Sequence, residues 1–229
     1  MMTVGDNFRA IGQRVELACE RAGRDPKEVI IVGAAKQVKP ERICQAVEAG
    51  LKHVGENYVQ EALEKVGLLP ASIERHFIGH LQTNKVRQVV PVFDWVHSMD
   101  RVGLAEEISK RAVLVGRVIR GLVEVNLGYE ESKSGVAPER LAELLSAISG
   151  LPGIAVVGLM AIPPARENPE ESRRDFREMR TLSNEMDHRG ISRVSMQYLS
   201  MGMTNDFDVA IEEGANIIRV GTGIFGPRS

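Results

Sequence analysis

The feature that most constrains the fold is a regular alternation of short apolar runs and longer amphipathic segments. The short runs carry many β-branched side chains, which indicates strands buried on both faces. They span residues 29–35, 53–56, 75–80, 93–99, 122–127, 154–161, 194–199 and 216–220. Apolar side chains at three- and four-residue spacing predict helices between these runs. The helices are expected over residues 3–23, 40–50, 57–66, 83–90, 100–115, 138–148, 169–188 and 206–214, with Asp100 as the N-cap of the fifth.

This alternation predicts an α/β fold with a parallel sheet and helices outside, and eight repeats predict closure into a (β/α)₈ TIM barrel. An open doubly wound sheet is the alternative, but no Gly-x-Gly-x-x-Gly follows the first run. A barrel accounts for all 229 residues. We therefore expect one domain over residues 1–229, with an N-terminal helix and no second domain.

Composition narrows the classes of partner. The chain has 29 basic and 31 acidic residues and a net charge of −2, which gives no electrostatic reason to expect nucleic acid or a membrane surface as a partner. No apolar run approaches the roughly 20 residues of a membrane helix, and the N-terminus lacks a signal-peptide pattern. A cytoplasmic protein is expected. Cys19 and Cys44 show no pairing motif, so we expect both to be reduced and structural.

Lys36 is the first candidate functional residue. It follows the apolar run Ile31-Val-Gly-Ala-Ala35, and barrel chemistry takes place at the carboxyl ends of the strands. Desolvation in the barrel mouth would lower the lysine pKa and let the amine form a Schiff base with a carbonyl compound. The alternative is a lysine that reaches the rim and stays solvated.

Arg219 is the second candidate, because it lies inside the apolar run 216–220. A guanidinium in a barrel needs an acceptor, which is either a protein carboxylate or a ligand atom. The run ends in Gly221-Thr222-Gly223, where backbone N–H groups and a hydroxyl could bind a phosphate. An ordinary turn is the alternative. The seventh run is expected to end in another polar, glycine-containing turn, Ser200–Thr204, and barrels commonly bind phosphate after strands seven and eight.

The five histidines show no metal-binding spacing, so no metal site is expected. Methionines near the barrel mouth, among them Met201 and Met203, could pack against a flat ring, although they could equally fill the core.

Five stretches together resemble the pyridoxal phosphate homeostasis protein family, which shares its fold-type III barrel with the N-terminal domain of alanine racemase. They are Gly33–Lys36, His53–Glu61, His76–Lys85, Leu199–Asp206 and Arg219–Gly226. This chain has Ala35 and Gln37 where the family usually has a serine before the lysine and a threonine after it. The departure leaves the lysine itself in place.

The resemblance implies pyridoxal 5′-phosphate as the cofactor and assigns residues to it. Lys36 would carry the Schiff base and Arg219 would face the pyridine nitrogen. The phosphate would be held by Ser200, Gly202, Gly221 and Thr222. The remaining residues of the matching motifs would line the cofactor, namely Asn57, His80, Met201 and Met203.

We therefore expect a monomeric carrier that buffers pyridoxal phosphate and delivers it to apoenzymes, with no catalytic residues of its own. An arginine at the pyridine nitrogen would leave the ring a weak electron sink, which disfavours carbanion chemistry. An amino-acid racemase is the main alternative, disfavoured because no second domain is expected. A class I aldolase that forms a Schiff base directly on a sugar phosphate is the third.

Overall fold

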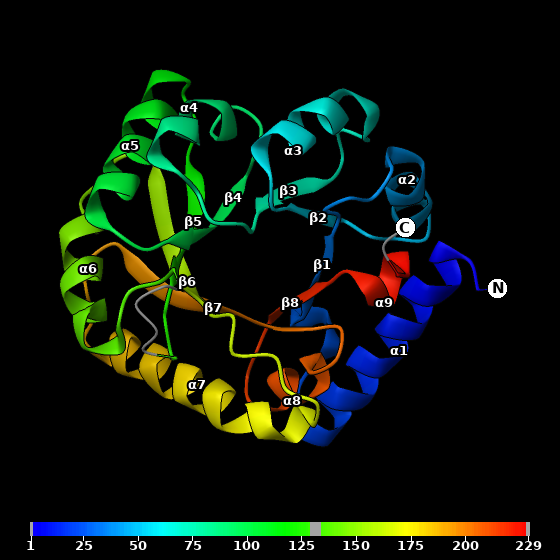
Figure 1. The fold of residues 1–229 in the computed structure, drawn as a ribbon. Helices are drawn as coiled ribbons and strands as arrows, with labels where there is room; N and C mark the ends of the chain where they lie inside the picture. The colour runs from blue at the N-terminus through cyan, green and yellow to red at the C-terminus, as the bar shows by residue number, and fades with distance from the viewer. Residues whose placement is uncertain (1, 129–133, 228–229) are drawn as a thin grey trace.

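The computed structural model describes residues 2–128 and 134–227, and its centre is a closed barrel of eight parallel strands in the order β1 to β8. β1 pairs with β8 to close the ring, as Figure 1 shows along the barrel axis. The predicted TIM barrel is confirmed. The strands are β1 Ile30–Ala34, β2 His53–Glu56, β3 Glu74–Phe77, β4 Trp95–Met99, β5 Ile119–Glu124, β6 Ile154–Met160, β7 Val194–Met203 and β8 Ile217–Val220.

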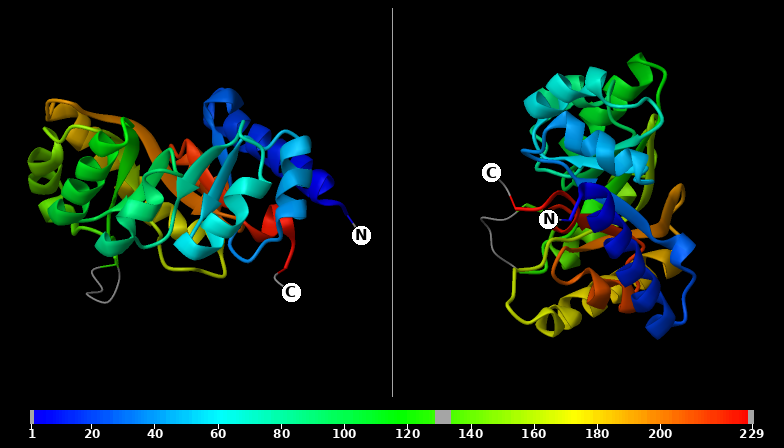
Figure 2. Two further views of the ribbon diagram at one scale, coloured as in Figure 1. Left: turned by 90° about the horizontal axis from the view of Figure 1, so that it is seen from above. Right: turned by 90° about the vertical axis from the view of Figure 1, so that its right-hand side faces the viewer.

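Helices surround the strands on the outside of the barrel (Figures 1 and 2). They are α1 Val4–Ala22, α2 Pro40–Glu48, α3 Val59–Lys65, α4 Val86–Val89, α5 Val102–Leu114, α6 Leu141–Ile148, α7 Arg173–His188, α8 Phe207–Glu212 and α9 Thr222–Phe225. Short 3₁₀ turns lie at Pro26–Glu28, Val66–Leu68, Thr83–Lys85, Pro138–Arg140 and Pro169–Ser172. None of the helices in the described part of the chain is both long and apolar enough to cross a membrane.

Helix α1 ties the last units of the barrel together. Its N-terminus has a capping box between Thr3 and Asp6. Near the start of the helix the Asn7 side chain donates to the carbonyl of Ile224 at 3.0 Å, and Arg24, just beyond the end of the helix, donates to the carbonyl of Ala215 at 2.7 Å. Helix α9, which follows β8, lies beside α1 (Figure 1). The helix therefore fixes the segments before and after β8.

The barrel interior has an apolar part and a polar part. Trp95, Leu122 and Ile217 belong to a buried apolar cluster inside the ring. His76 and His97 are also fully buried there. Buried imidazoles need hydrogen-bond partners, and these two side chains bond to each other at 2.9 Å.

Several expected boundaries were wrong: β3 ends at Phe77 and β5 at Glu124, three residues earlier than expected in each case, and three other differences have local reasons. Helix α5 begins at Val102, and the Asp100 carboxylate pairs with the Arg101 guanidinium at 2.6 Å instead of capping a helix. Strand β5 begins at Ile119, earlier than predicted, because Arg120 pairs with Glu74 at 2.7 Å and is accommodated in the strand. Strand β7 continues to Met203, so the expected turn Ser200–Thr204 is largely strand.

Candidate cofactor site

A cavity of about 350 Å³ opens at the carboxyl ends of the strands. Its volume falls in the usual range of small-molecule sites, roughly 300–1,000 Å³. Among the predicted site residues, six line it: Lys36, Asn57, Met203, Arg219, Gly221 and Thr222. Strands β1, β2, β7 and β8 therefore bring one amine, one guanidinium and the glycine-threonine turn to a single space.

Lys36 lies in the turn after β1 and is half-buried. Hydrogen bonds with helix α3 hold this turn in place. The Lys65 ammonium donates to the carbonyl of Ala35 at 2.8 Å, and the Glu61 carboxylate accepts from the backbone N–H of Gln37. Both neighbours of Lys36 are thus anchored to helix α3.

Arg219 is buried, with 4% of its surface exposed. Its guanidinium donates to the Ser200 carbonyl at 2.9 Å, to the Ser200 hydroxyl at 2.6 Å and to the Ala161 carbonyl at 2.9 Å. Burial lowers the pKa of Arg219 to about 10, while Glu124 and Asp206 act in the opposite direction. The group therefore remains a cation at neutral pH and presents fixed positive charge to the cavity.

The turn after β8 is joined to the end of β7 by Thr204. The Thr204 hydroxyl accepts from the backbone N–H of Gly223 at 3.2 Å and lies 3.3 Å from the Thr222 hydroxyl. Thr204 also lines the cavity, as does Arg166. Neither was assigned a cofactor role from the sequence. Thr204 stood within the expected turn, whereas Arg166 lies in the loop after β6, which carries no recognisable pattern.

Ser200, Met201 and Gly202 are not among the residues that line this cavity. All three are buried in the extended part of β7. The Ser200 hydroxyl bonds to His97 and Arg219, and Gly202 has a φ of 89° at an irregularity in the pairing with β8. Their observed contacts place Ser200 and Gly202 behind the cavity wall, where they support Arg219 and Met203.

Asn57 and His80 mark a second, adjoining cavity of about 400 Å³. Asn57 lines both cavities, and its buried Oδ1 has no hydrogen-bond partner among the described residues. His80 is exposed, and its Nδ1 lies 2.8 Å from the Ser134 hydroxyl. Buried hydrogen-bond acceptors normally have a donor, and this amide oxygen has none among the described residues. A donor group on a bound ligand could therefore hydrogen-bond to it.

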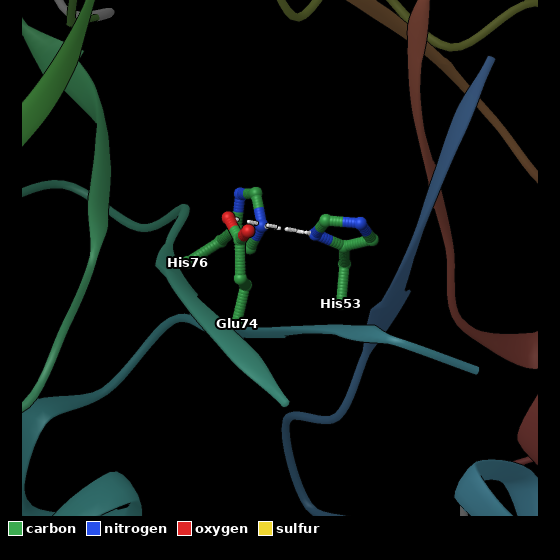
Figure 3. A group of neighbouring side chains, drawn as sticks. All are labelled: His53, Glu74 and His76. Atoms are coloured by element: carbon green, nitrogen blue, oxygen red, sulfur yellow. Dashed lines mark hydrogen bonds and ion pairs between the residues drawn. The ribbon is translucent and has the colours of Figure 1, made fainter. Parts of the chain in front are cut away.

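One polar cluster was missed by sequence reasoning. His53, Glu74 and His76 meet at the opposite end of the barrel interior, with their potential ligand atoms within 4.8 Å of one another (Figure 3). Their spacing along the chain resembles no metal motif. They come together through the register of β2 and β3, in which His53 is the direct partner of Glu74.

The comparisons with known proteins agree on one family. Residues 7–229 match the model of the alanine racemase N-terminal domain. The chain is 47% identical over 228 residues to a pyridoxal phosphate homeostasis protein of Aquifex aeolicus, covering 99% of each protein.

Solved structures agree with this result. PipY of Synechococcus elongatus, with pyridoxal phosphate bound, has a TM-score of 0.81 and 36% identity, and the match covers 94% of this chain and all (100%) of PipY. An alanine racemase of Clostridium difficile has a TM-score of 0.76 at 14% identity, covering 97% of this chain and 57% of the racemase. The racemase shows a shared barrel fold.

Proposed function

This chain belongs to the pyridoxal phosphate homeostasis protein family, and on that basis we propose that it binds pyridoxal 5′-phosphate as a Schiff base on Lys36 and buffers or delivers the cofactor in the cytoplasm. The observation that carries the proposal is the meeting of Lys36, Arg219 and the Gly221–Gly223 turn around one cavity. A relative whose structure has pyridoxal phosphate bound, PipY, shares the fold.

The polar groups around the cavity match the four functional groups of this cofactor. Lys36 supplies an amine for the aldehyde, and Arg219 supplies a cation that can donate toward the ring nitrogen. Backbone N–H groups of the turn and the Thr222 hydroxyl can donate to a phosphate. The unpartnered Oδ1 of Asn57 can accept from a hydroxyl on the ring. When bound, the cofactor supplies a carbonyl carbon for amines and a ring that withdraws electrons.

We assign direct contact to the residues that line the cavity and support to the others. Lys36, Asn57, Met203, Arg219, Gly221 and Thr222 are the proposed contact residues. Ser200, Met201 and Gly202 position the end of β7 from behind it. His80 borders the adjoining cavity, through which an incoming amine could reach the cofactor.

The charge on Arg219 favours a carrier over an enzyme. A guanidinium has no proton acceptor, so a pyridine nitrogen beside it stays unprotonated and the ring withdraws electrons weakly. Thr222 is exposed and Lys36 is half-buried, which leaves a route for exchange with solvent. Water is poorly excluded from such a site, and protected carbanion chemistry is disfavoured. We propose that the protein acts as a monomer and that its partners are pyridoxal-phosphate-dependent apoenzymes.

The decisive experiment combines absorption spectroscopy with borohydride reduction. The wild type, Lys36→Ala and Lys39→Ala are incubated with pyridoxal phosphate, freed of excess, and scanned before and after reduction. The wild type and Lys39→Ala should show a Schiff-base band that borohydride removes, and mass spectrometry should find the reduced cofactor on Lys36. A wild type without the band, or cofactor fixed at other lysines only, would overturn the proposal.

The carrier role is tested separately from binding. Loaded protein is mixed with an apoenzyme of known activity, and recovery of that activity is compared with the recovery given by the same amount of free cofactor. In parallel, L-alanine is incubated with the loaded protein and its optical rotation is followed. Activation without loss of rotation supports a carrier, whereas steady loss of rotation that Lys36→Ala lacks would identify a racemase.

A further inference from the structure

Three side chains with metal-binding atoms face one another at the N-terminal end of the barrel interior (Figure 3). His53 begins β2, Glu74 begins β3 and His76 lies two residues further along β3. His53 Nδ1 lies 3.1 Å from His76 Nε2 and 3.9 Å from a carboxylate oxygen of Glu74. This end of the barrel is the one opposite the cofactor cavity.

We propose that His53, Glu74 and His76 bind one divalent transition-metal ion of the zinc class. Two imidazoles and a carboxylate, with water completing the coordination, are a ligand set that zinc uses in proteins. Two nitrogens at zinc–nitrogen distances of about 2.05 Å in a tetrahedral arrangement lie about 3.3 Å apart. The observed separation of 3.1 Å between the facing nitrogens requires only a small adjustment.

The facing nitrogens are the atoms that an ion would use. A hydrogen bond between His53 Nδ1 and His76 Nε2, 3.1 Å apart, requires one of these nitrogens to carry a hydrogen. An ion bound to both nitrogens takes the place of that hydrogen, and the ring that carried it holds its hydrogen on the other nitrogen instead.

Surrounding groups already hold the ligands in place. The indole N–H of Trp95 donates to Glu74 at 2.7 Å, and the Trp95 ring stacks on His76 at 5.1 Å with an interplanar angle of 12°. The second nitrogen of His76 lies 2.9 Å from His97 Nε2. Metal-bound histidines normally have their other nitrogen engaged in this way, which fixes the ring orientation.

Arg120 is the group that competes with the ion. Its guanidinium donates to the same Glu74 oxygen at 2.7 Å and lies over the Trp95 ring at 4.9 Å. A cation there repels a divalent ion, but the side chain is 46% exposed and can turn into solvent. Removal of its charge should therefore strengthen metal binding, which is the opposite of what loss of a structural contact would do.

Metal binding would also change the hydrogen-bond chain that leads toward the cofactor site. Because a guanidinium can only donate, the Ser200 hydroxyl accepts from Arg219 and is free to donate to His97, 3.1 Å away. The protons then point from Ser200 through His97 and His76 toward His53. An ion on His76 Nε2 forces the proton of that ring to Nδ1, so that His97 donates to Ser200 instead.

The test titrates cobalt(II) and zinc(II) into chelator-treated, full-length protein. All samples carry Cys44→Ser, so that no half-buried thiol competes for the metal. Cobalt binding is followed by visible absorption, zinc binding by calorimetry, and the ring tautomers by ¹⁵N NMR of labelled histidine. We expect one ion per chain and a switch of the His76 and His97 tautomers.

Three variants and one control decide the assignment. His53→Asn keeps an acceptor near the Nδ1 position, Glu74→Gln keeps the shape, and each should weaken binding about tenfold or more. Arg120→Gln should tighten it. His188→Asn, on the outer face of α7, should change nothing. The proposal is overturned if the wild type binds no ion, if His53→Asn binds as tightly as the wild type, or if Arg120→Gln fails to increase affinity.

Discussion

The ammonium group of Lys65 lies 2.8 Å from the carbonyl oxygen of Ala35, the residue before Lys36. The same ammonium donates to Glu56 at 2.8 Å and to Glu61 at 2.6 Å. Burial raises the pKa of Glu56 to about 7, and Lys65 opposes that shift. The position of the proposed cofactor lysine therefore depends on a second, buried lysine that belongs to another element.

Replacement of Lys65 by methionine should destabilise the protein strongly. The substitution keeps the length of the side chain but removes the ammonium that pairs with the buried Glu56 carboxylate, and it takes one of the donors from Glu61 and one from the Ala35 carbonyl. Breaking a buried ion pair in this way costs about 3–5 kcal/mol. Urea unfolding of the cofactor-free protein measures the loss.

Lys110→Met, on the exposed face of α5, is the matched control and should change the free energy of unfolding by less than about 0.5 kcal/mol. Equal unfolding midpoints for the two variants would show that the Lys65 network does not stabilise the turn.

The sequence predicted the barrel because its alternation of apolar runs and amphipathic segments is a local property of the chain. It also predicted that Lys36 and Arg219 lie at the ends of strands. These positions could be predicted because each residue stands within or directly after an apolar run that marks its strand. The sequence missed Lys65, because a lysine in an amphipathic helix normally faces solvent. Only the packing of α3 against the turn after β1 shows that this one is buried.

The end of β7 could not be predicted for a related reason. Ser-Met-Gly-Met-Thr has the composition of a turn, yet strand β7 continues to Met203 through an irregularity in its pairing with β8, and Gly202 lies in this irregularity with a φ of 89° that glycine adopts without strain. The histidine cluster depends on strand register, which a list of spacings does not contain. Its members lie on neighbouring strands and meet only after β2 and β3 pair.

Gly202 gives a second prediction. A Cβ atom on this residue would lie 2.6 Å from Ala210 Cβ and 2.9 Å from Phe207 Cα, at a φ of 89°. Gly202→Ala should therefore lower the free energy of unfolding by more than about 1 kcal/mol, through strain and overpacking. Gly12→Ala, in helix α1 with open space around it, should have no such effect and should stabilise by up to about 1 kcal/mol. Thermal unfolding of the two variants compares them directly, and similar melting temperatures would contradict this account.

The raised pKa of the buried Glu124 side chain leads us to expect that stability depends on pH. It ends β5 with only 7% of its surface exposed, and burial raises its pKa to about 7, Asp100 adding to this and Arg219 opposing it. The folded protein therefore holds a proton that the unfolded chain releases near its ordinary pKa of 4.5. The stability contributed by this group is present below about pH 4.5 and is lost as the pH rises through about 7. The difference between the pKa of Glu124 in the folded protein and its ordinary pKa corresponds to a change of at most about 3 kcal/mol in the free energy of unfolding.

Urea unfolding of cofactor-free protein at about pH 5 and about pH 8 tests this effect. Glu56 shifts in the same direction, so the comparison is between the wild type and Glu124→Gln. The decline in stability with pH should be smaller in Glu124→Gln, and Glu20→Gln on the exposed side of α1 should follow the wild type. An identical decline in all three proteins would mean that Glu124 titrates normally.

The last prediction separates ligand contacts from structural contacts in the turn after β8. Thr222 is exposed, and within residues 2–128 and 134–227 its hydroxyl has one weak partner, the Thr204 hydroxyl at 3.3 Å. Thr222→Val keeps the shape of the side chain, so stability without cofactor should change little. If Thr222 donates to the cofactor phosphate, loss of a hydrogen bond to a charged group should weaken binding by about 1.5–3 kcal/mol, roughly 10- to 150-fold. Fluorescence titration with pyridoxal phosphate measures this, with Thr181→Val on α7 as the control. An unchanged dissociation constant would remove Thr222 from the proposed contacts and leave the phosphate to backbone N–H groups alone.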